Sequence, residues 1–123
     1  MQYQAEITRF VDQAQKDPRV VGLILYGSYL QGGHFRDIDL ALFLQPGMSN
    51  KDMMHIRLNY LKDAPDIFDI QIYNLLPLVV KKDILKGKVL YESFPMYDMA
   101  YQVIREYEDF EKYIIQYREV VLQ

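Results

Sequence analysis

The feature that most restricts the fold is the stretch VVGLILYGSYLQGGHFRDIDLALFL, residues 20–44. It begins with an apolar run that predicts a β-strand over residues 20–26, and the glycine–serine pair at 27–28 then predicts a sharp turn. A second run, residues 37–44, begins with Asp-Ile-Asp and continues with apolar residues alone. An apolar run without alternation is typical of a strand that is buried on both faces.

Two carboxylates lie at the start of the second predicted strand. Asp37 and Asp39 are two residues apart, so their side chains point to the same face of a strand. Burying carboxylates is costly unless a cation or hydrogen bonds compensate their charge. Mg²⁺ is a hard cation that binds carboxylates together with the phosphates of a substrate. The pair therefore predicts a divalent metal site beside a bound phosphate.

The turn at Gly27 and Ser28 suits such a phosphate. Glycine lets the backbone come close to a ligand, free N–H groups at the start of a helix bind anions, and a serine hydroxyl donates to a phosphate oxygen. A third strand is predicted over residues 67–73 by clear alternation. Asp69 lies on the polar face of this strand, which makes it the best candidate for a third metal ligand.

Hydrophobic periodicity predicts the remaining elements. They are helices over residues 2–16, 51–63, 77–86 and 95–121, with a short strand or extended link over 88–91. In the second helix we expect an inward face of Met54, Leu58 and Leu61. The apolar stripe of the last helix fits either a core contact or a partner surface, and it runs through Ala100, Val103, Tyr107, Phe110, Ile114, Tyr117 and Val121. This helix would be roughly 40 Å long, enough to outreach its own domain.

Length and composition limit the classes of protein that the chain can belong to. Its 123 residues, half of them apolar and a quarter charged, suit one soluble globular domain over 1–123. The formal net charge of −3 argues against a protein that holds long nucleic acid by its phosphates. The chain has no cysteine, no apolar signal core and no apolar run of membrane-spanning length, so we expect a cytoplasmic protein without a membrane partner.

These motifs resemble those of the nucleotidyltransferase superfamily of DNA polymerase beta, and above all its small stand-alone group, the minimal nucleotidyltransferases (MNT). The resemblance covers most of the chain and is carried by the segments GSYLQG, DIDLAL, FDIQIY and ILKGKVLYES. It implies an α/β (α+β) nucleotidyltransferase fold. We expect a small mixed sheet with helices mainly on one face, and a long C-terminal helix. Arg36 departs from the family pattern, because a serine is usual at this place.

The resemblance also implies roles for particular residues. The nucleotide-binding residues would be Gly27, Ser28 and Gln31, and the catalytic metal ligands would be Asp37, Asp39 and Asp69. Two Mg²⁺ ions would bind with ATP as the substrate. Asp69 would also help to activate the attacking hydroxyl, which would attack the α-phosphorus and release pyrophosphate.

Members of the MNT group are often encoded beside a helical HEPN-domain protein, and the pair resembles a toxin–antitoxin system. The resemblance implies that this chain is an antitoxin that transfers AMP to a tyrosine hydroxyl of a HEPN toxin. An alternative stays open, in which the chain is a non-catalytic binding module that neutralises the toxin by complex formation. Replacing Asp37 or Asp39 separates the two hypotheses, because only the first one needs the carboxylates.

Overall fold

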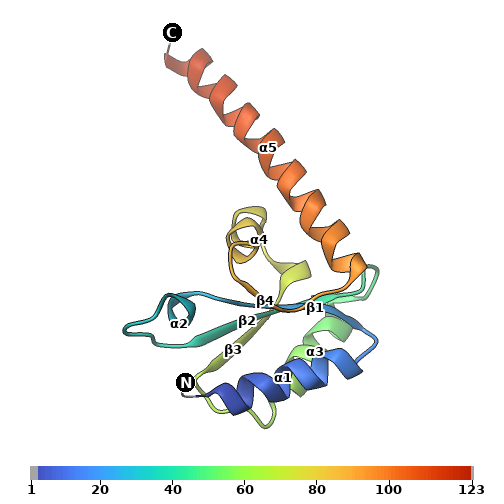
Figure 1. Cartoon of the computed structure of the whole chain (residues 1–123). Helices are drawn as coiled ribbons and strands as arrows, with labels where there is room; N and C mark the ends of the chain where they lie inside the picture. The colour runs from blue at the N-terminus through green and yellow to red at the C-terminus, as the bar shows by residue number, and fades with distance from the viewer. Residues whose placement is uncertain (1–2, 123) are drawn as a thin grey trace.

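A four-stranded sheet forms the centre of the protein in this computed structural model, which describes residues 3–122 (Figure 1). The strands are β1 (Val20–Tyr26), β2 (Ile38–Leu44), β3 (Phe68–Ile72) and β4 (Lys88–Tyr91). Their spatial order is β3-β2-β1-β4. β1 runs antiparallel to both β2 and β4, whereas β2 and β3 are parallel. The sheet is therefore mixed, as the sequence predicts.

The helices also lie close to their predicted positions. They are α1 (Gln4–Lys16), α2 (Ser28–Gln31), α3 (Asn50–Leu61), the 3₁₀ helix η1 (Tyr73–Leu75), α4 (Leu78–Ile84) and α5 (Phe94–Leu122). The hydroxyl of Ser49 caps α3 by accepting a hydrogen bond of 3.1 Å from the N–H of Asp52. Among the helices of residues 3–122, none combines the length and the apolar character needed to cross a membrane.

The larger core lies between the sheet, α1 and α3. Alternate side chains of the strands, such as Leu23, Leu40 and Ile70, point into it and are buried. From α1, Phe10 packs edge to face on Phe68 at a ring-centroid distance of 5.1 Å. Because burial of apolar surface is the dominant favourable contribution to folding, this layer holds β1, β2 and β3 in place.

The inward face of α3 differs from the predicted one. Met54 and Leu58 were expected to face inward, but they are 40% and 58% exposed, and only Leu61 packs partly against the core. The buried residues are Met53, Ile56 and Tyr60. Both sets have helical spacing, so the periodicity of this segment fits two faces equally well. The prediction was wrong because only contacts with the sheet decide between them.

A second core covers the opposite face of the sheet. α4 and the first turns of α5 pack on the side of Ile24 and Phe43, where the rings of Phe43 and Tyr73 stack at 3.9 Å. Helices therefore cover both faces of the sheet, whereas the prediction placed them mainly on one face. The larger of the two cores does lie on a single face, under α1 and α3. The physical reason for helices on both faces is the double-sided apolar character of β1 and β2, which requires a cover on each side.

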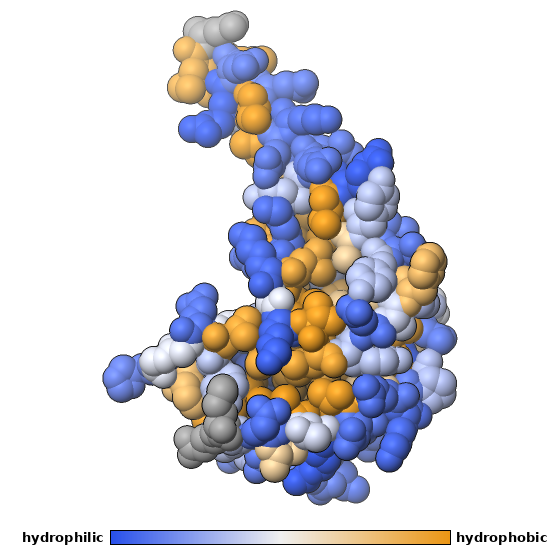
Figure 2. Space-filling view, in the orientation of Figure 1, coloured by the Kyte–Doolittle hydropathy of each residue, from blue (hydrophilic) through white to orange (hydrophobic). Residues whose placement is uncertain are grey.

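α5 leaves the body of the protein after its first turns (Figure 1). Met96 and Val103 are buried, and Gly22 in β1 leaves room for the Met96 side chain. Farther along, Phe110 is 42% exposed and Tyr117 is 58% exposed. In Figure 2 this part of α5 forms an arm on which apolar groups lie among hydrophilic ones. The expectation that the last helix outreaches the rest of the fold is confirmed.

Candidate active site

The acidic residues predicted for catalysis lie along one face of β2 and β3. Asp39 and Asp69 are paired directly across these parallel strands. Their neighbours Leu40 and Ile70 point into the larger core, so the two carboxylates point to the other side of the sheet, where α4 and α5 lie. Asp37 comes just before β2 and, by the same alternation, belongs to this side. The backbone thus brings the three predicted ligands to one face.

The charges of these carboxylates act on one another. Asp39 is partly buried, and its pKa is raised from the ordinary value, first by burial and then by the negative charges of Asp69 and Asp37. A divalent cation bound here would favour the ionised carboxylates and compensate for their burial. Three oxygen-donor residues of this kind fit Mg²⁺, which prefers carboxylates.

The side chain of Asp69 has other donors in the structure. Gln71 Nε2 lies 3.1 Å from Oδ1 and 3.2 Å from Oδ2 of Asp69, and Arg57 Nη2 lies 3.5 Å from Oδ1. Across residues 3–122, no three Asp, Glu or His side chains gather closely enough to hold a metal ion. The three carboxylates therefore share a face of the sheet without being gathered around one point, and both oxygens of Asp69 lie near donors of the protein.

Gly27 links the predicted phosphate turn to the carboxylates. It follows β1, in which Tyr26 pairs with Asp39 across the antiparallel strands. Its φ of 83° lies in the left-handed region that favours glycine, and a Cβ at this position would overlap with the carboxylate of Asp39. The glycine turn and the Asp-x-Asp strand, which are ten residues apart in the sequence, thus form one site.

Ser28 and Gln31, the other predicted nucleotide-binding residues, begin and end α2. Both are exposed, whereas Tyr29 between them is buried and packs edge to face on Phe35 at 4.9 Å. This aromatic contact anchors α2 beside the ends of β1 and β2. The side chains of Ser28 and Gln31 are therefore accessible to a ligand.

Tyr26 lies in the same row as the predicted ligands, although no sequence motif points to it. The strand register places Tyr26, Asp39 and Asp69 in one row across β1, β2 and β3. Burial, followed by the charges of Asp39 and Asp69, raises the pKa of Tyr26 to about 12. Its phenol is therefore protonated at neutral pH and can donate a hydrogen bond to an anion. Its position directly before Gly27 was the one available signal in the sequence.

Arg57 is a second residue to which no sequence motif points. It belongs to α3, which lies on the opposite face from the carboxylates, so its side chain reaches Asp69 around the edge strand β3. Its Nε donates a hydrogen bond of 2.5 Å to the backbone carbonyl of Ile70. One guanidinium thus satisfies an edge carbonyl and holds the third carboxylate. Sequence alone offers no signal for this contact, because it depends on where α3 lies against β3.

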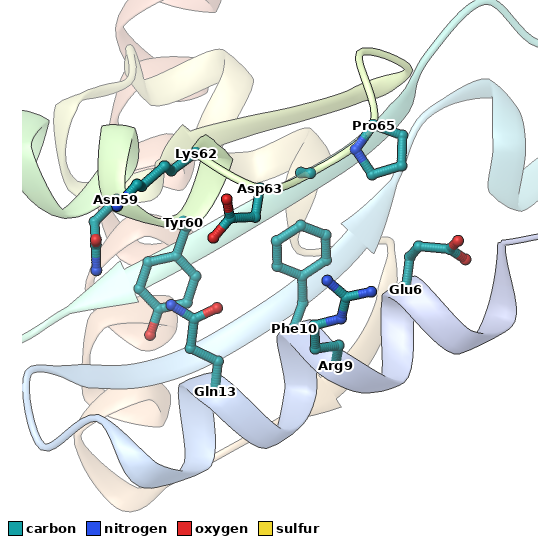
Figure 3. Close-up of a pocket in the computed structure, with 10 residues that line it drawn as sticks. Glu6, Arg9, Phe10, Gln13, Asn59, Tyr60, Lys62, Asp63 and Pro65 are labelled. Atoms are coloured by element: carbon teal, nitrogen blue, oxygen red, sulfur yellow. The ribbon is translucent and has the colours of Figure 1, made fainter.

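A cavity of about 190 Å³ lies on the face of the sheet away from the carboxylates (Figure 3). Figure 3 shows Phe10 from α1 and Tyr60 from α3 pointing into the space between the two helices. The hydroxyl of Tyr60 donates a hydrogen bond of 3.0 Å to Asp17 Oδ2. None of the predicted site residues lines this cavity, so it is separate from the carboxylate row.

Comparison with known proteins agrees with the geometry of the carboxylate face. A family model described as "Polymerase beta, Nucleotidyltransferase" matches residues 9–94. This range contains the glycine turn, the Asp-x-Asp strand and Asp69. Among curated proteins, no sequence matches the chain.

Several solved structures share the fold over nearly their whole length. One is a toxin–antitoxin structure with AMP-PNP, 19% identical, with a TM-score of 0.67 over 97% of this chain and 98% of that chain. A second is the tri-AMPylated Shewanella oneidensis HEPN toxin in complex with MNT antitoxin, where the match is 16% identical, with a TM-score of 0.64 over 97% of this chain and 95% of that chain. A third comes from Shewanella oneidensis, 15% identical, with a TM-score of 0.67 over 98% and 99% of the two chains.

Proposed function

The chain belongs to the polymerase beta nucleotidyltransferase family, and from this premise we propose that it transfers AMP from ATP to a hydroxyl of a partner protein. One observation carries the proposal. The register of β2 and β3 places Asp39 beside Asp69, and Gly27 of the predicted phosphate turn lies against Asp39. A phosphate site and an acidic row in contact are what a nucleotidyl transfer requires.

In this proposal the turn after β1 binds the terminal phosphates of ATP. Gly27 has no side chain between the backbone and the ligand, and Ser28 offers a hydroxyl and the first N–H of α2. Gln31 at the end of α2 adds an amide donor. These groups would leave the α-phosphorus beside the acidic row.

Asp37, Asp39 and Asp69 would hold Mg²⁺, two ions by the family resemblance. Bound there, the metal supplies Lewis-acid stabilisation of the charge on the transferred phosphoryl group. Asp69, once released from Arg57 and Gln71, would accept the proton of the acceptor hydroxyl. A bond forms between the acceptor oxygen and the α-phosphorus, the bond from that phosphorus to the bridging oxygen breaks, and pyrophosphate leaves.

The acceptor that we propose is a tyrosine of a HEPN toxin, which would make this chain an antitoxin. Two similarities support this choice. One structure of the same fold is a toxin–antitoxin with AMP-PNP, and another contains an AMPylated HEPN toxin bound to an MNT antitoxin. The first also supports ATP as the nucleotide. A reaction that consumes ATP suits the cytoplasm.

A second candidate function is a binding module that neutralises the toxin without chemistry. The contact of Asp69 with Arg57 and Gln71 favours it, because these donors occupy the carboxylate that the reaction needs. Under this alternative the carboxylate row would be structural. The exposed arm of α5 would then be the important surface.

Labelled ATP tests the proposal. This protein and a HEPN-domain protein are mixed with Mg²⁺ and ATP that carries the label on either the α- or the γ-phosphate. We expect label on the partner from α-labelled ATP alone, and a loss of at least about a hundredfold in Asp39→Asn. Asp66→Asn is the control, because Asp66 is exposed in the turn before β3. A stable complex with no label from either ATP would contradict the transfer and favour the binding module.

A further inference from the structure

One apolar stripe runs along α5, and the rest of the protein covers only part of it. Its members are spaced alternately by four and three residues: Met96, Ala100, Val103, Tyr107, Phe110, Ile114, Tyr117 and Val121. This spacing is the seven-residue pattern of helices that pack along their length. The covered and uncovered parts of α5 therefore continue a single packing surface.

The covered part of the stripe ends at Tyr107. Met96 and Val103 are 3% and 5% exposed in the second core. Lys82 of α4 lies over the Tyr107 ring, with its Nζ 4.1 Å from the ring centroid. Met96, Val103 and Tyr107 are therefore covered by the body of the protein.

The four residues beyond it form what we call the distal stripe: Phe110, Ile114, Tyr117 and Val121. Phe110, Tyr117 and Val121 are 42%, 58% and 57% exposed, and Ile114 is partly exposed. Figure 1 shows this part of α5 standing away from the sheet and the other helices. An apolar helix face of this kind marks a site of association.

The charges beside the distal stripe complement each other. Glu111 directly follows Phe110, and Arg118 directly follows Tyr117, so both charges lie on the same edge of the stripe, seven residues apart. Neither residue forms a salt bridge with any other residue of 3–122. Seven residues separate the two charges along one helix by roughly 10 Å, so a second molecule can bring opposite charges of this edge closer together than one helix does.

We propose that a second copy of this chain covers the distal stripe, with the two α5 helices antiparallel. A two-fold axis between Ile114 and Tyr117 places Phe110 opposite Val121 of the second copy, and Ile114 opposite its Tyr117. The same axis brings Glu111 of each copy beside Arg118 of the other, twice by symmetry. All four distal-stripe residues then gain apolar contacts, and both charges gain a partner.

Other arrangements of two copies satisfy fewer groups. In a parallel pair, Glu106 of each copy lies near Glu111 of the other copy, five positions later in the sequence. This arrangement creates two repulsive contacts between like charges. An antiparallel pair shifted by seven residues towards the body would have to pack the second copy on Tyr107, and Lys82 already covers this ring. Pairing of two copies requires opposite charges at positions that the two-fold axis brings together, and Glu111 and Arg118 meet this requirement. A helix of another protein would not require any particular spacing between these two residues.

Sedimentation velocity of the full chain from about 1 to 200 μM tests the pairing without any need for transferase activity. We expect a reversible monomer–dimer equilibrium. Ile114→Ser should weaken it by about a hundredfold, because each dimer loses two buried isoleucines. Ile115→Ser is the matched control, since it removes the same side chain from a different face of the helix. Circular dichroism should show equal helix content for both variants.

Charge reversal tests the register. Glu111→Arg and Arg118→Glu should each weaken the dimer by about tenfold. An equimolar mixture of these two variants should pair as tightly as the unchanged chain, because both contacts between the unlike copies are then attractive. A monomer at every concentration, a dimer indifferent to Ile114→Ser, or a mixture that fails to pair would overturn the proposal. So would distal-stripe variants that lose only the binding of a HEPN-domain protein, because that protein would then be the occupant.

Discussion

The backbone of Gly27 lies directly against the carboxylate of Asp39, so closely that no side chain fits between them. This contact joins a turn at the end of β1 to the start of β2. It explains why the site tolerates only glycine at this place, and it gives a direct test of whether the turn positions the carboxylate.

Gly27→Ala should both strain the backbone and displace Asp39. The φ of 83° and the overlap with the carboxylate act together, and we expect a loss of about 2–3 kcal/mol in the free energy of unfolding. AMP transfer should fall at least tenfold. Gly33→Ala is the control, because its φ of 75° is similarly strained but no atom lies within 4 Å of the added Cβ. Equal effects of the two variants in urea unfolding and in transfer would contradict the role of the contact.

Stability should depend on pH through Asp39. Its raised pKa means that the folded protein holds this proton more tightly than the unfolded chain does. The stabilisation is therefore present below the unfolded value near 3.8 and is lost as the pH rises through the folded pKa. At neutral pH and without divalent cations, Asp39→Asn should unfold at a higher temperature than the unchanged chain, and the difference should shrink in acid. A variant that is less stable at neutral pH would show that the ionised carboxylate contributes favourably.

Mg²⁺ should stabilise the folded protein by neutralising the carboxylate row. A ligand at about ten times its Kd adds about 1.4 kcal/mol, which a thermal unfolding scan detects. The shift should disappear in Asp39→Asn and in Asp69→Asn, and EDTA should reverse it. NaCl at equal ionic strength controls for general screening. A shift of the same size in both variants would place the binding of Mg²⁺ elsewhere.

The sequence predicted the helices and strands more closely than the packing between them. β1 has its predicted bounds, and α1 and α5 lie within a few residues of theirs, because long periodic segments carry strong local signals. The common face of Asp37 and Asp39 follows from alternation alone. The pairing of Asp69 with Asp39 needs β3 beside β2, and this neighbour relation between strands is not contained in either local segment.

Packing contacts were missed where two alternatives have the same local pattern. Met53 and Met54 stand on the two possible inward faces of α3, and the sheet selects the first. The contact of Arg57 with Asp69 depends on that same rotation of α3 and on the edge position of β3. Such contacts follow from the assembled layers, so they appear only once the helices and the sheet are placed together.

Arg57→Gln should separate the structural and the catalytic consequences of the guanidinium. It removes the donor to the Ile70 carbonyl, for which we expect a loss of about 1–2 kcal/mol in the free energy of unfolding. It also removes one of the two donors to Asp69 and leaves Gln71 as the other, so AMP transfer should reach half its maximum at a lower Mg²⁺ concentration. Arg9→Gln on the exposed face of α1 is the control. A loss of stability with an unchanged Mg²⁺ requirement would make Arg57 a purely structural residue.

The distal part of α5 should contribute little to the stability of a single copy. A chain that ends at Asp109 loses the part of α5 that stands away from the sheet and the other helices. Most side chains of this part are exposed, so we expect a change in the free energy of unfolding within about 0.5 kcal/mol at low concentration. Val103→Ala is the contrasting variant. Val103 is 5% exposed in the second core, and its truncation should cost roughly 1–3 kcal/mol. Urea unfolding at about 1 μM measures both changes under conditions that disfavour pairing of two copies. A large loss on shortening α5 would mean that its distal half supports the fold, and the arm would then be part of the core structure and not a surface kept free for association.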